Sequence, residues 1–262
     1  MLQLVIKGAV VALLIVALCQ ASQLTPTKRS PAVYKLFPST SVQAQPQPLP
    51  LQMLNAVVIN PTKLVLNFVG ELLRISGEAA DFPPAFALAQ LLDEVDATGT
   101  NGLRATPAQQ ASIEGLVSLL ERSSPTSRPA YSKLMAGSWE LLYTDFDPPA
   151  ASSGKLGPFV GRVFQDIQPQ NKQILNILKI TTPLRIDGEL SAAVSILDDQ
   201  TWQIEFRSLK LSVLGFQVQN KPFPTREVRN WQISYLDKNL RIMRASRPEP
   251  GAKSFIFILR RL

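Results

Sequence analysis

Two strand-like segments near the ends of the C-terminal half place the strongest constraint on how this chain folds. In residues 137–144, Trp139, Leu141 and Tyr143 fall on every second position, and alternate side chains of a strand share a face. Residues 235–260 repeat the alternation on both sides of a Pro-Gly turn. The two segments predict the first and last strands of one sheet that closes on itself.

The chain between these segments keeps the same period of two. Apolar and polar residues alternate around Trp202-Ile204-Phe206, Trp231-Ile233, Leu190-Ile196 and Val163-Ile167. Turn signals separate such runs at Asn171-Lys172, Asp187-Gly188, Asp198-Asp199, Pro222 to Pro224, Asp237 to Asn239 and Pro250-Gly251. The pattern predicts an antiparallel meander of about eight or nine strands, as a two-layer sandwich or a closed barrel, and only closure removes both sheet edges.

Residues 51–130 have helical rather than strand periodicity. Apolar residues recur at helical spacing from Leu64 to Ser76 and again from Phe86 to Val95. The third run begins with Thr106 as N-cap, Pro107 in the first turn and Gln109 in the capping-box position. The expected fold class is therefore mainly β with an N-terminal helical lead-in (α+β).

The N-terminus has the composition of a targeting leader. An apolar run from Gly8 to Cys19 follows Lys7 and ends near Ala21, as in a secretory signal peptide, and it is shorter than the roughly 20 residues of a bilayer span. Residues 22–50 are rich in Pro, Ser and Thr and are expected to be disordered. The predicted organisation is 1–21 signal-peptide-like, 22–50 transit-like leader, 51–130 helical lead-in and 131–262 barrel.

The positive charge is concentrated in the leader. Of the 27 basic residues five precede Glu71, the first of the 20 acidic residues, so the remainder carries a net charge of +2 rather than +7. Nucleic acid is therefore not an expected partner. The acid-free leader indicates either entry into an organelle through the secretory route or an ordinary secreted protein.

Several kinds of catalytic site are excluded by residue type. The chain has no His, and its one Cys, Cys19, lies beside the expected cleavage point. Catalytic Ser-His-Asp and Cys-His arrangements need a His, and His and Cys are the common ligands of transition metals. We therefore expect no metal site, no cofactor and no catalytic residues.

Aromatic residues of the strand segments are the candidate ligand contacts. If they face one enclosed space, they form a pocket for a lipid or pigment; otherwise they are ordinary core residues. The candidates for the barrel lining are Tyr143, Phe164 (or its neighbour Gln165), Phe206, Phe216, Trp231 and Tyr235.

A family resemblance covers about residues 71–260. It is carried by Asn101-Gly102-Leu103, Thr106, Leu120-Glu121, Pro125-Thr126, Gly137, Trp139, Leu141-Leu142-Tyr143-Thr144, Phe164-Gln165, Asn176, Tyr235, Asp237, Leu240-Arg241-Ile242, Arg244, Phe257 and Arg260. With these residues the chain resembles the plastid lipid-associated proteins, also called fibrillins or plastoglobulins, whose fold is a lipocalin-like barrel. Ala245 replaces the usual Gly, and residues 246–253 are longer and richer in Pro than in the family.

The resemblance implies a non-enzymatic plastid protein of thylakoids or plastoglobules. Its implied ligands are prenylquinones, carotenoids or acyl lipids, and its implied partner is a membrane or lipid-droplet surface. The signal-like leader differs from a simple plant plastid transit peptide and is similar to the bipartite signal and transit presequences of algae whose plastids lie within the secretory route. Gly137 and Trp139 are similar to the first-strand motif of lipocalins, in which the Trp plugs one end of the barrel. Arg244 or Arg260 is the expected cation stacked on that Trp.

Three hypotheses follow for the function. The first is a barrel that binds or organises hydrophobic small molecules, and the second is a structural coat or scaffold that acts through its surface and through residues 51–84. The third and weakest is a lipid-metabolising enzyme using a buried carboxylate such as Asp166 or Glu205.

Overall fold

Two α-helices precede the sheet. The computed structural model describes residues 84–223 and 226–262, and its helices are α3 (Pro84–Ala97) and α4 (Pro107–Arg122). Short 3-10 turns are η1 (Thr100–Gly102), η2 (Pro129–Tyr131), η3 (Lys133–Met135), η4 (Ala151–Ser153) and η5 (Pro169–Asn171). The predicted capping box starts α4: the Thr106 amide donates to Gln109 Oε1 at 3.0 Å and the Gln109 amide donates to Thr106 Oγ1 at 3.3 Å.

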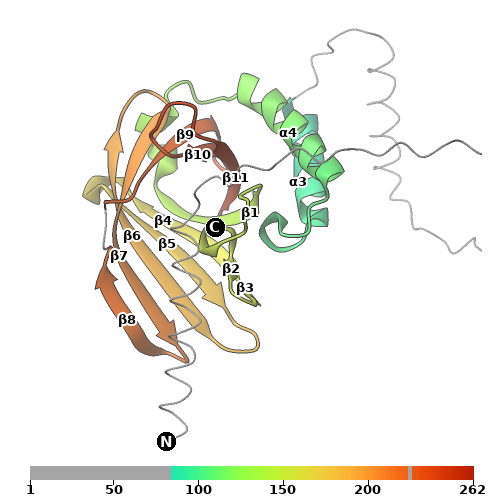
Figure 1. Cartoon of the computed structure of the whole chain (residues 1–262). Helices are drawn as coiled ribbons and strands as arrows, with labels where there is room; N and C mark the ends of the chain where they lie inside the picture. The colour runs from blue at the N-terminus through green and yellow to red at the C-terminus, as the bar shows by residue number, and fades with distance from the viewer. Residues whose placement is uncertain (1–83, 224–225) are drawn as a thin grey trace, which may run out of the picture. The chain divides into compact units, whose positions relative to one another are not determined.

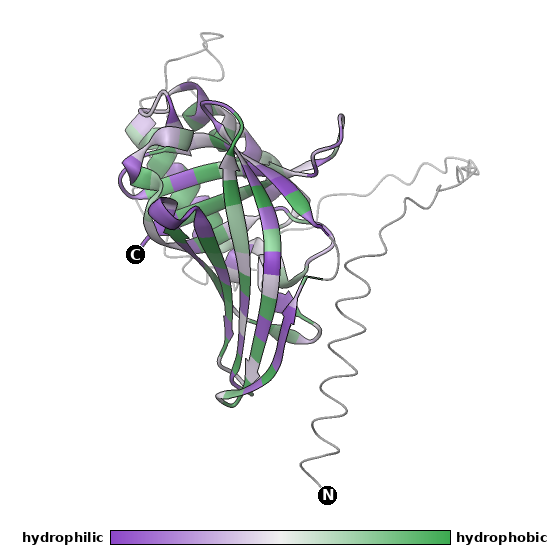
Figure 2. Cartoon of the chain, turned by 90° about the vertical axis from the view of Figure 1, so that its left-hand side faces the viewer, coloured by the Kyte–Doolittle hydropathy of each residue, from purple (hydrophilic) through white to green (hydrophobic). Residues whose placement is uncertain are grey.

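The strands follow the helices in one antiparallel meander. They are β1 (Gly137–Thr144), β4 (Arg162–Gln168), β5 (Gln173–Ile180), β6 (Ile186–Ile196), β7 (Thr201–Val213), β8 (Phe216–Pro222), β9 (Val228–Leu236), β10 (Leu240–Ser246) and β11 (Ser254–Arg261), with a separate small hairpin of β2 (Lys155–Leu156) and β3 (Phe159–Val160). Figure 2 shows hydrophobic and hydrophilic bands alternating along several of these strands, as a sheet with two different faces requires.

The sheet closes into a barrel, as predicted. Its order is β6-β5-β4-β1-β11-β10-β9-β7-β8, and a further pairing of β6 with β7 joins the ends of an eight-strand ring, leaving β8 outside it. The first and last strands are hydrogen-bonded neighbours, with Trp139 opposite Arg261. The two segments that indicated closure in the sequence therefore meet directly.

One predicted turn is wrong. Asp187-Gly188 lies inside β6, where Gly188 pairs with Leu178 of β5 and Leu211 of β7. Asp-Gly often forms a turn, but here the backbone of both residues is paired with strands on both sides, and this continuous pairing keeps the segment extended.

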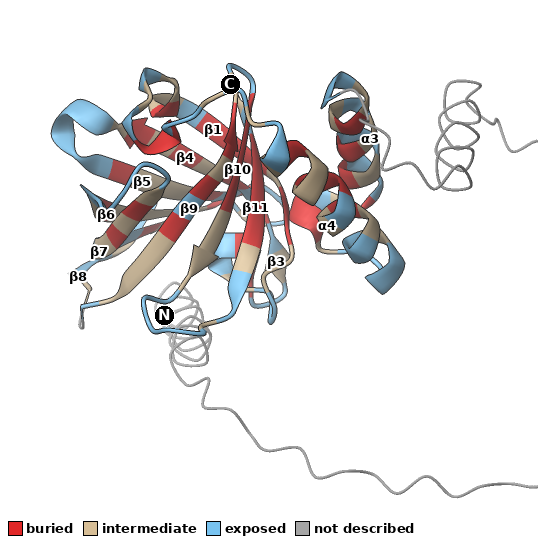
Figure 3. Ribbon diagram, turned by 90° about the horizontal axis from the view of Figure 1, so that it is seen from above, coloured by how far each residue is buried: buried red, intermediate tan, exposed pale blue. Residues whose placement is uncertain are grey.

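Both helices lie on one side of the barrel, beside β1 and β11 (Figure 1). Their apolar stripes, represented by Leu91 and Leu120, pack on outward-facing residues of the strands such as Ile242 and Ile258. Arg244 of β10 adds ion pairs to α4, 2.7 Å from both Glu114 and Glu121. In Figure 3 the buried residues of β9 to β11 continue into those of α4.

The core therefore has two parts separated by the wall of the barrel. The outer cluster lies between the barrel wall and the helices, and the inner cluster lies inside the barrel and includes Trp139, Ile204, Ile233 and Leu259. The expectations for the leader, for the helix around Leu64 and for residues 51–83 lie outside the described residues.

Candidate functional site

The interior of the barrel is the candidate site, and one of its ends is closed by Trp139. The indole is completely buried, and its Nε1 donates to the Met135 carbonyl oxygen at 3.1 Å. Met135, in η3, is itself completely buried. A turn that precedes the first strand thus covers this end of the barrel.

A second tryptophan secures the same end. Trp202 Nε1 donates to the carbonyl oxygen of Ala130, in η2, at 2.8 Å. Both residues belong to the inner cluster. Buried tryptophans require a hydrogen-bond acceptor for the indole N–H. The two indoles find theirs on the backbone of η2 and η3, and so they fix these two turns over the end of the barrel.

The cations stacked on Trp139 are not the predicted ones. The guanidinium carbon of Arg261 lies 4.4 Å from the Trp139 ring centroid, and that of Arg241 lies 4.8 Å away. Arg260 points outward to Glu140, at 2.7 Å, and Arg244 points outward to α4. Because side chains alternate along a strand, the prediction of Arg260 missed the inward-facing residue by one position.

Gly137 is required by the same arrangement. Its φ is +111°, and a Cβ there would lie 2.9 Å from Arg261 Nη1. That nitrogen donates to the Ala136 carbonyl oxygen at 2.7 Å. The predicted structural role of Gly137 beside the plug thus acquires a steric reason.

Two predicted lining residues, Tyr143 and Tyr235, lie outside the barrel, packed in the helix-facing cluster. The ladder between β1 and β11 shifts register between Leu141 and Tyr143, and that between β9 and β10 shifts opposite Ser234. Each β-bulge inserts one residue and reverses the face of the following side chain. Simple alternation therefore predicted the wrong face for both tyrosines.

The other four aromatic candidates divide equally. Phe206 and Trp231 belong to the inner cluster or pack against it. Phe164 lies on the outer face, with the cationic groups of Arg162 and Lys179 5.2 and 5.4 Å from its ring centroid. Phe216 is 74% exposed on β8, which lies outside the ring. These two residues do not line the barrel.

Sequence reasoning missed a buried polar group inside the barrel. Arg241 is completely buried, and its neighbours across the ladders, Leu236 and Leu259, belong to the inner cluster. Its Nη2 donates to Gln165 Oε1, and Gln165 Nε2 donates to Asn176 Oδ1 at 3.1 Å. Both Gln165 and Arg241 were visible as polar residues within apolar alternation, which is the signal that identifies such a group.

The charge of Arg241 is not compensated by a carboxylate. Burial, and secondarily the positive charge of Arg261, lowers the pKa of Arg241 to about 9. Among the described residues, Arg241 Nε and Nη1 and Asn176 Nδ2 are buried atoms that lack a hydrogen-bond partner. Three buried donor atoms of the Arg241–Gln165–Asn176 network are thus unused.

Away from Trp139 the inner surface is incompletely covered. β7 pairs with β9 only as far as Glu205 and then continues beside β8. Apolar side chains packed against the inner cluster keep partial exposure in this part of the barrel, among them Phe146, Phe206, Val213 and Phe255. We call these four side chains the mouth residues.

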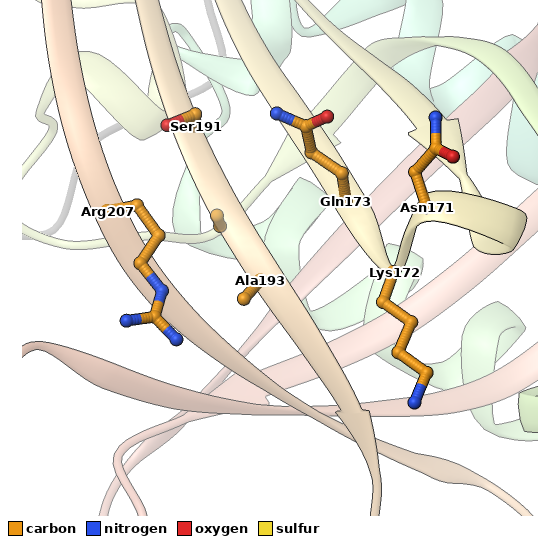
Figure 4. A pocket seen from close by; sticks show the side chains of 7 residues that line it. Asn171, Lys172, Gln173, Ser191, Ala193 and Arg207 are labelled. Atoms are coloured by element: carbon orange, nitrogen blue, oxygen red, sulfur yellow. The ribbon is translucent and has the colours of Figure 1, made fainter.

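The outer wall carries a shallow polar pocket of about 230 Å³ (Figure 4). Asn171, Lys172 and Gln173 line one side of it, and Ser191, Ala192, Ala193 and Arg207 line the remainder. Its cationic side chains extend into solvent. It lacks the apolar lining expected of a site for a hydrophobic molecule.

The two carboxylates considered for catalysis lie on the outer face. Glu205 forms ion pairs with Arg207 at 3.1 Å and Arg226 at 3.5 Å. Asp166 accepts a hydrogen bond from Ser138 Oγ at 3.2 Å. Neither carboxylate contributes to the barrel interior.

Asp237 has the predicted turn role, since its Oδ1 accepts hydrogen bonds from the amides of Asn239 and Leu240 at 2.6 Å.

The described residues contain neither a membrane-spanning helix nor a cluster of metal-binding side chains. Within residues 84–223 and 226–262, no helix has the length and apolar character needed to cross a membrane. In the same residues no group of three or more acidic, His or Cys side chains is arranged to hold a metal ion.

The sequence comparison decides the family. The PAP_fibrillin family model matches residues 87–258. This range contains most of α3, all of α4 and nearly all of the barrel strands. The chain belongs to this family. The fibrillin resemblance seen in the sequence is therefore confirmed.

Two relatives from Arabidopsis thaliana illustrate the similarity. The probable plastid-lipid-associated protein 5, chloroplastic, is 28% identical over 212 residues, covering 76% of this chain and 83% of the relative. The probable plastid-lipid-associated protein 12, chloroplastic, is 30% identical over 190 residues, covering 66% of this chain and 44% of the relative. No solved structure matches the chain significantly.

Proposed function

We propose that this fibrillin-family barrel binds hydrophobic small molecules, such as prenylquinones, carotenoids or acyl lipids, at plastid thylakoids or plastoglobules. The observation that carries the proposal is the difference between the two parts of the barrel: Trp139 and its covering turns close one end, whereas the mouth residues remain partly exposed. A half-covered apolar interior with one closed end suits an elongated apolar molecule.

The plastid part of the proposal is supported by the relatives. Both printed names describe plastid-lipid-associated, chloroplastic proteins. The bipartite leader predicted from residues 1–50 is consistent with the same destination.

Ligand transfer tests the proposal. The purified full chain, freed of lipid, is mixed with galactolipid vesicles that contain decyl-plastoquinone or β-carotene, and the vesicles are removed by flotation. We expect ligand absorbance in the protein fraction. Folded protein that takes up neither ligand nor a fatty acid contradicts the proposal.

A matched pair of variants locates the uptake. Phe206→Ser removes a mouth aromatic, whereas Phe164→Ser removes an aromatic from the outer face of the same sheet. Uptake should fall in the first variant and persist in the second, with circular dichroism showing that both fold. Equal uptake by both would place the ligand elsewhere.

A surface coat is the second candidate, and the turn between β7 and β8 favours it. These two strands form the hairpin at the lower left of Figure 1, and at its turn Leu214 and Phe216 are 60% and 74% exposed. Apolar side chains at an exposed hairpin turn are suited to enter a lipid monolayer.

The second candidate has its own test. In a flotation assay with triacylglycerol droplets, the double variant Leu214→Ser/Phe216→Ser should lose droplet association while retaining ligand uptake by the barrel. The control is Leu262→Ser, which changes another exposed apolar side chain, 65% exposed. Unchanged flotation of the double variant would exclude the hairpin as the contact.

A further inference from the structure

The inference concerns the buried guanidinium of Arg241. Long side chains with a charge are almost never fully buried unless they are paired, and burial of an unpaired charge is unfavourable. Arg241 is nevertheless completely buried on the inner face of β10.

The described neighbours of Arg241 do not supply an anion. Its polar contact is the neutral Gln165 side chain, and its guanidinium carbon lies 4.8 Å from the Trp139 ring centroid. The nearest cation that affects it, Arg261, carries the same sign of charge. Glu140, although buried, lies on the outer face with Arg162 and Arg260.

The unpartnered hydrogen-bonding atoms of the Arg241–Gln165–Asn176 network are donors. Arg241 Nε and Nη1 have no acceptor, and the Nδ2 of Asn176, which belongs to the same side-chain network through Gln165, has none. A network that presents several buried donors and a positive charge is complementary to an oxyanion.

The surroundings favour an amphiphile over a free ion. Inward-facing Ile167 and Ile174 lie on one side of the Gln165–Asn176 pair along β4 and β5, and Val163 and Leu178 lie on the other. Leu190 and Leu209, which follow Asn176 in register on β6 and β7, keep partial exposure. An anion bound beside Gln165 and Asn176 would therefore have apolar side chains of the inner wall on both sides. A hydrocarbon chain attached to the anion can pack on these side chains.

We propose that Arg241 and Asn176 bind the carboxylate of a single-chain acyl lipid, whose tail follows the inner wall toward the mouth residues. One uncompensated cation matches the single charge of a carboxylate, whereas a phosphate monoester carries about −1.5 to −2 at neutral pH. The inference rests on the proposed function, because it names the class of molecule that the barrel binds.

Two probes with the same tail test the headgroup separately from the tail. Oleate and oleyl alcohol are titrated calorimetrically into the lipid-free full chain. We expect oleate to bind about tenfold or more tightly than the alcohol, as a charge-assisted hydrogen bond implies. Equal binding of the two overturns the carboxylate site but leaves the hydrophobic carrier intact; binding of neither, together with no uptake of quinone or carotenoid, overturns the carrier as well.

Arg241→Gln should abolish the preference for oleate, because oleate should lose far more affinity than oleyl alcohol. The control is Arg207→Gln, which alters an arginine exposed on β7 and should retain the preference. A preference that survives in Arg241→Gln overturns the proposal. Acetate or inorganic phosphate binding as tightly as oleate in an Arg241-dependent manner also overturns it, because the site would then be one for a small anion.

A second variant guards against loss of folding. Asn176→Asp places a carboxylate in the network of Arg241, so it should fold at least as stably as the parent and should bind oleate at least tenfold more weakly, since the internal anion occupies the donors. A folded Asn176→Asp variant that binds oleate with parental affinity contradicts the proposal.

Discussion

The guanidinium of Arg261 covers the ring of Trp139 and simultaneously holds the chain that precedes it. Its carbon lies 4.4 Å from the ring centroid, and its Nη1 and Nε donate to the carbonyl oxygens of Ala136 and Lys238 at 2.7 and 2.8 Å. The last strand thus fastens both the first strand and the turn at Lys238. A residue next to the C-terminus thereby organises the closed end of the barrel.

Arg261→Ala should therefore lower the free energy of unfolding by about 2–3 kcal/mol, through loss of the cation–π contact and of hydrogen bonds to the half-buried Ala136 and the exposed Lys238 backbone carbonyls. Urea unfolding followed by Trp fluorescence measures the change. Arg185→Ala, which removes an exposed ion pair with Asp187, should cost under about 1 kcal/mol. Equal effects of the two variants would show that the Arg261 contacts contribute little.

Gly137→Ala should destabilise by about 1–3 kcal/mol, because the added Cβ meets Arg261 in a backbone conformation with φ of +111°. Gly115→Ala is the matched control: it lies within α4, and nothing lies within 4 Å of its added Cβ. That control should stabilise by about 0.5–1 kcal/mol through helix propensity. Thermal unfolding measures both changes, and a stable Gly137→Ala variant would contradict the steric argument.

The attachment of α4 to the barrel should depend on Arg244. Its Nε lies 2.7 Å from Glu121 Oε1, and the Glu121 side chain is 19% exposed. A double-mutant cycle of Arg244→Gln and Glu121→Gln should give a coupling free energy of about 1 kcal/mol, larger than for a fully exposed pair. The exposed pair Arg128–Asp199 provides the comparison, and equal coupling in both cycles would refute the distinction.

Tyr143 should make the stability fall at alkaline pH. Burial, with smaller contributions from Asp145 and Glu114, raises the pKa of Tyr143 to about 12. Between pH 10 and this value only the unfolded chain loses the proton, so the contribution is complete below pH 10 and declines as the pH rises, by up to about 1.4 kcal/mol per unit. Urea titrations at pH 9 to 11 should show a shallower decline for Tyr143→Phe, while Tyr131→Phe, at a 55% exposed position, should match the parent.

Asn101 should be important for joining the helical region to the barrel loops. Its buried Nδ2 donates to the carbonyl oxygens of Ser153 and Gly161 at 3.0 and 2.8 Å. Asn101→Ala leaves both acceptors unpaired and should cost about 2–3 kcal/mol. Asn171→Ala, which removes an exposed hydrogen bond to Gln168, should change stability by less than about 0.5 kcal/mol; a comparable loss in both variants would show that the Asn101 contacts are dispensable.

The Asn101 position also shows what a motif can and cannot reveal. Asn101-Gly102-Leu103 contributed to the family resemblance, but its physical role was not apparent in the sequence. In the structure Asn101 has a φ of +55°, and a Cβ on Gly102 would lie 2.5 Å from the Tyr143 ring. The motif is a tight turn whose shape is set by Tyr143, which lies 41 residues beyond Gly102 in the chain.

The amino-acid pattern by itself determined the antiparallel meander and the capping box of α4, whereas the β6–β7 pairing in the tertiary structure decided for a closed barrel over a sandwich. Period-two alternation, turn residues and helix caps act over a few residues, so they can be read locally. Only the tertiary structure decided the faces of Tyr143 and Tyr235, since each follows a β-bulge that depends on pairing with a distant strand. The same holds for Arg241, which barrel closure turned inward, where its guanidinium is buried and donates to the neutral Gln165 side chain of β4.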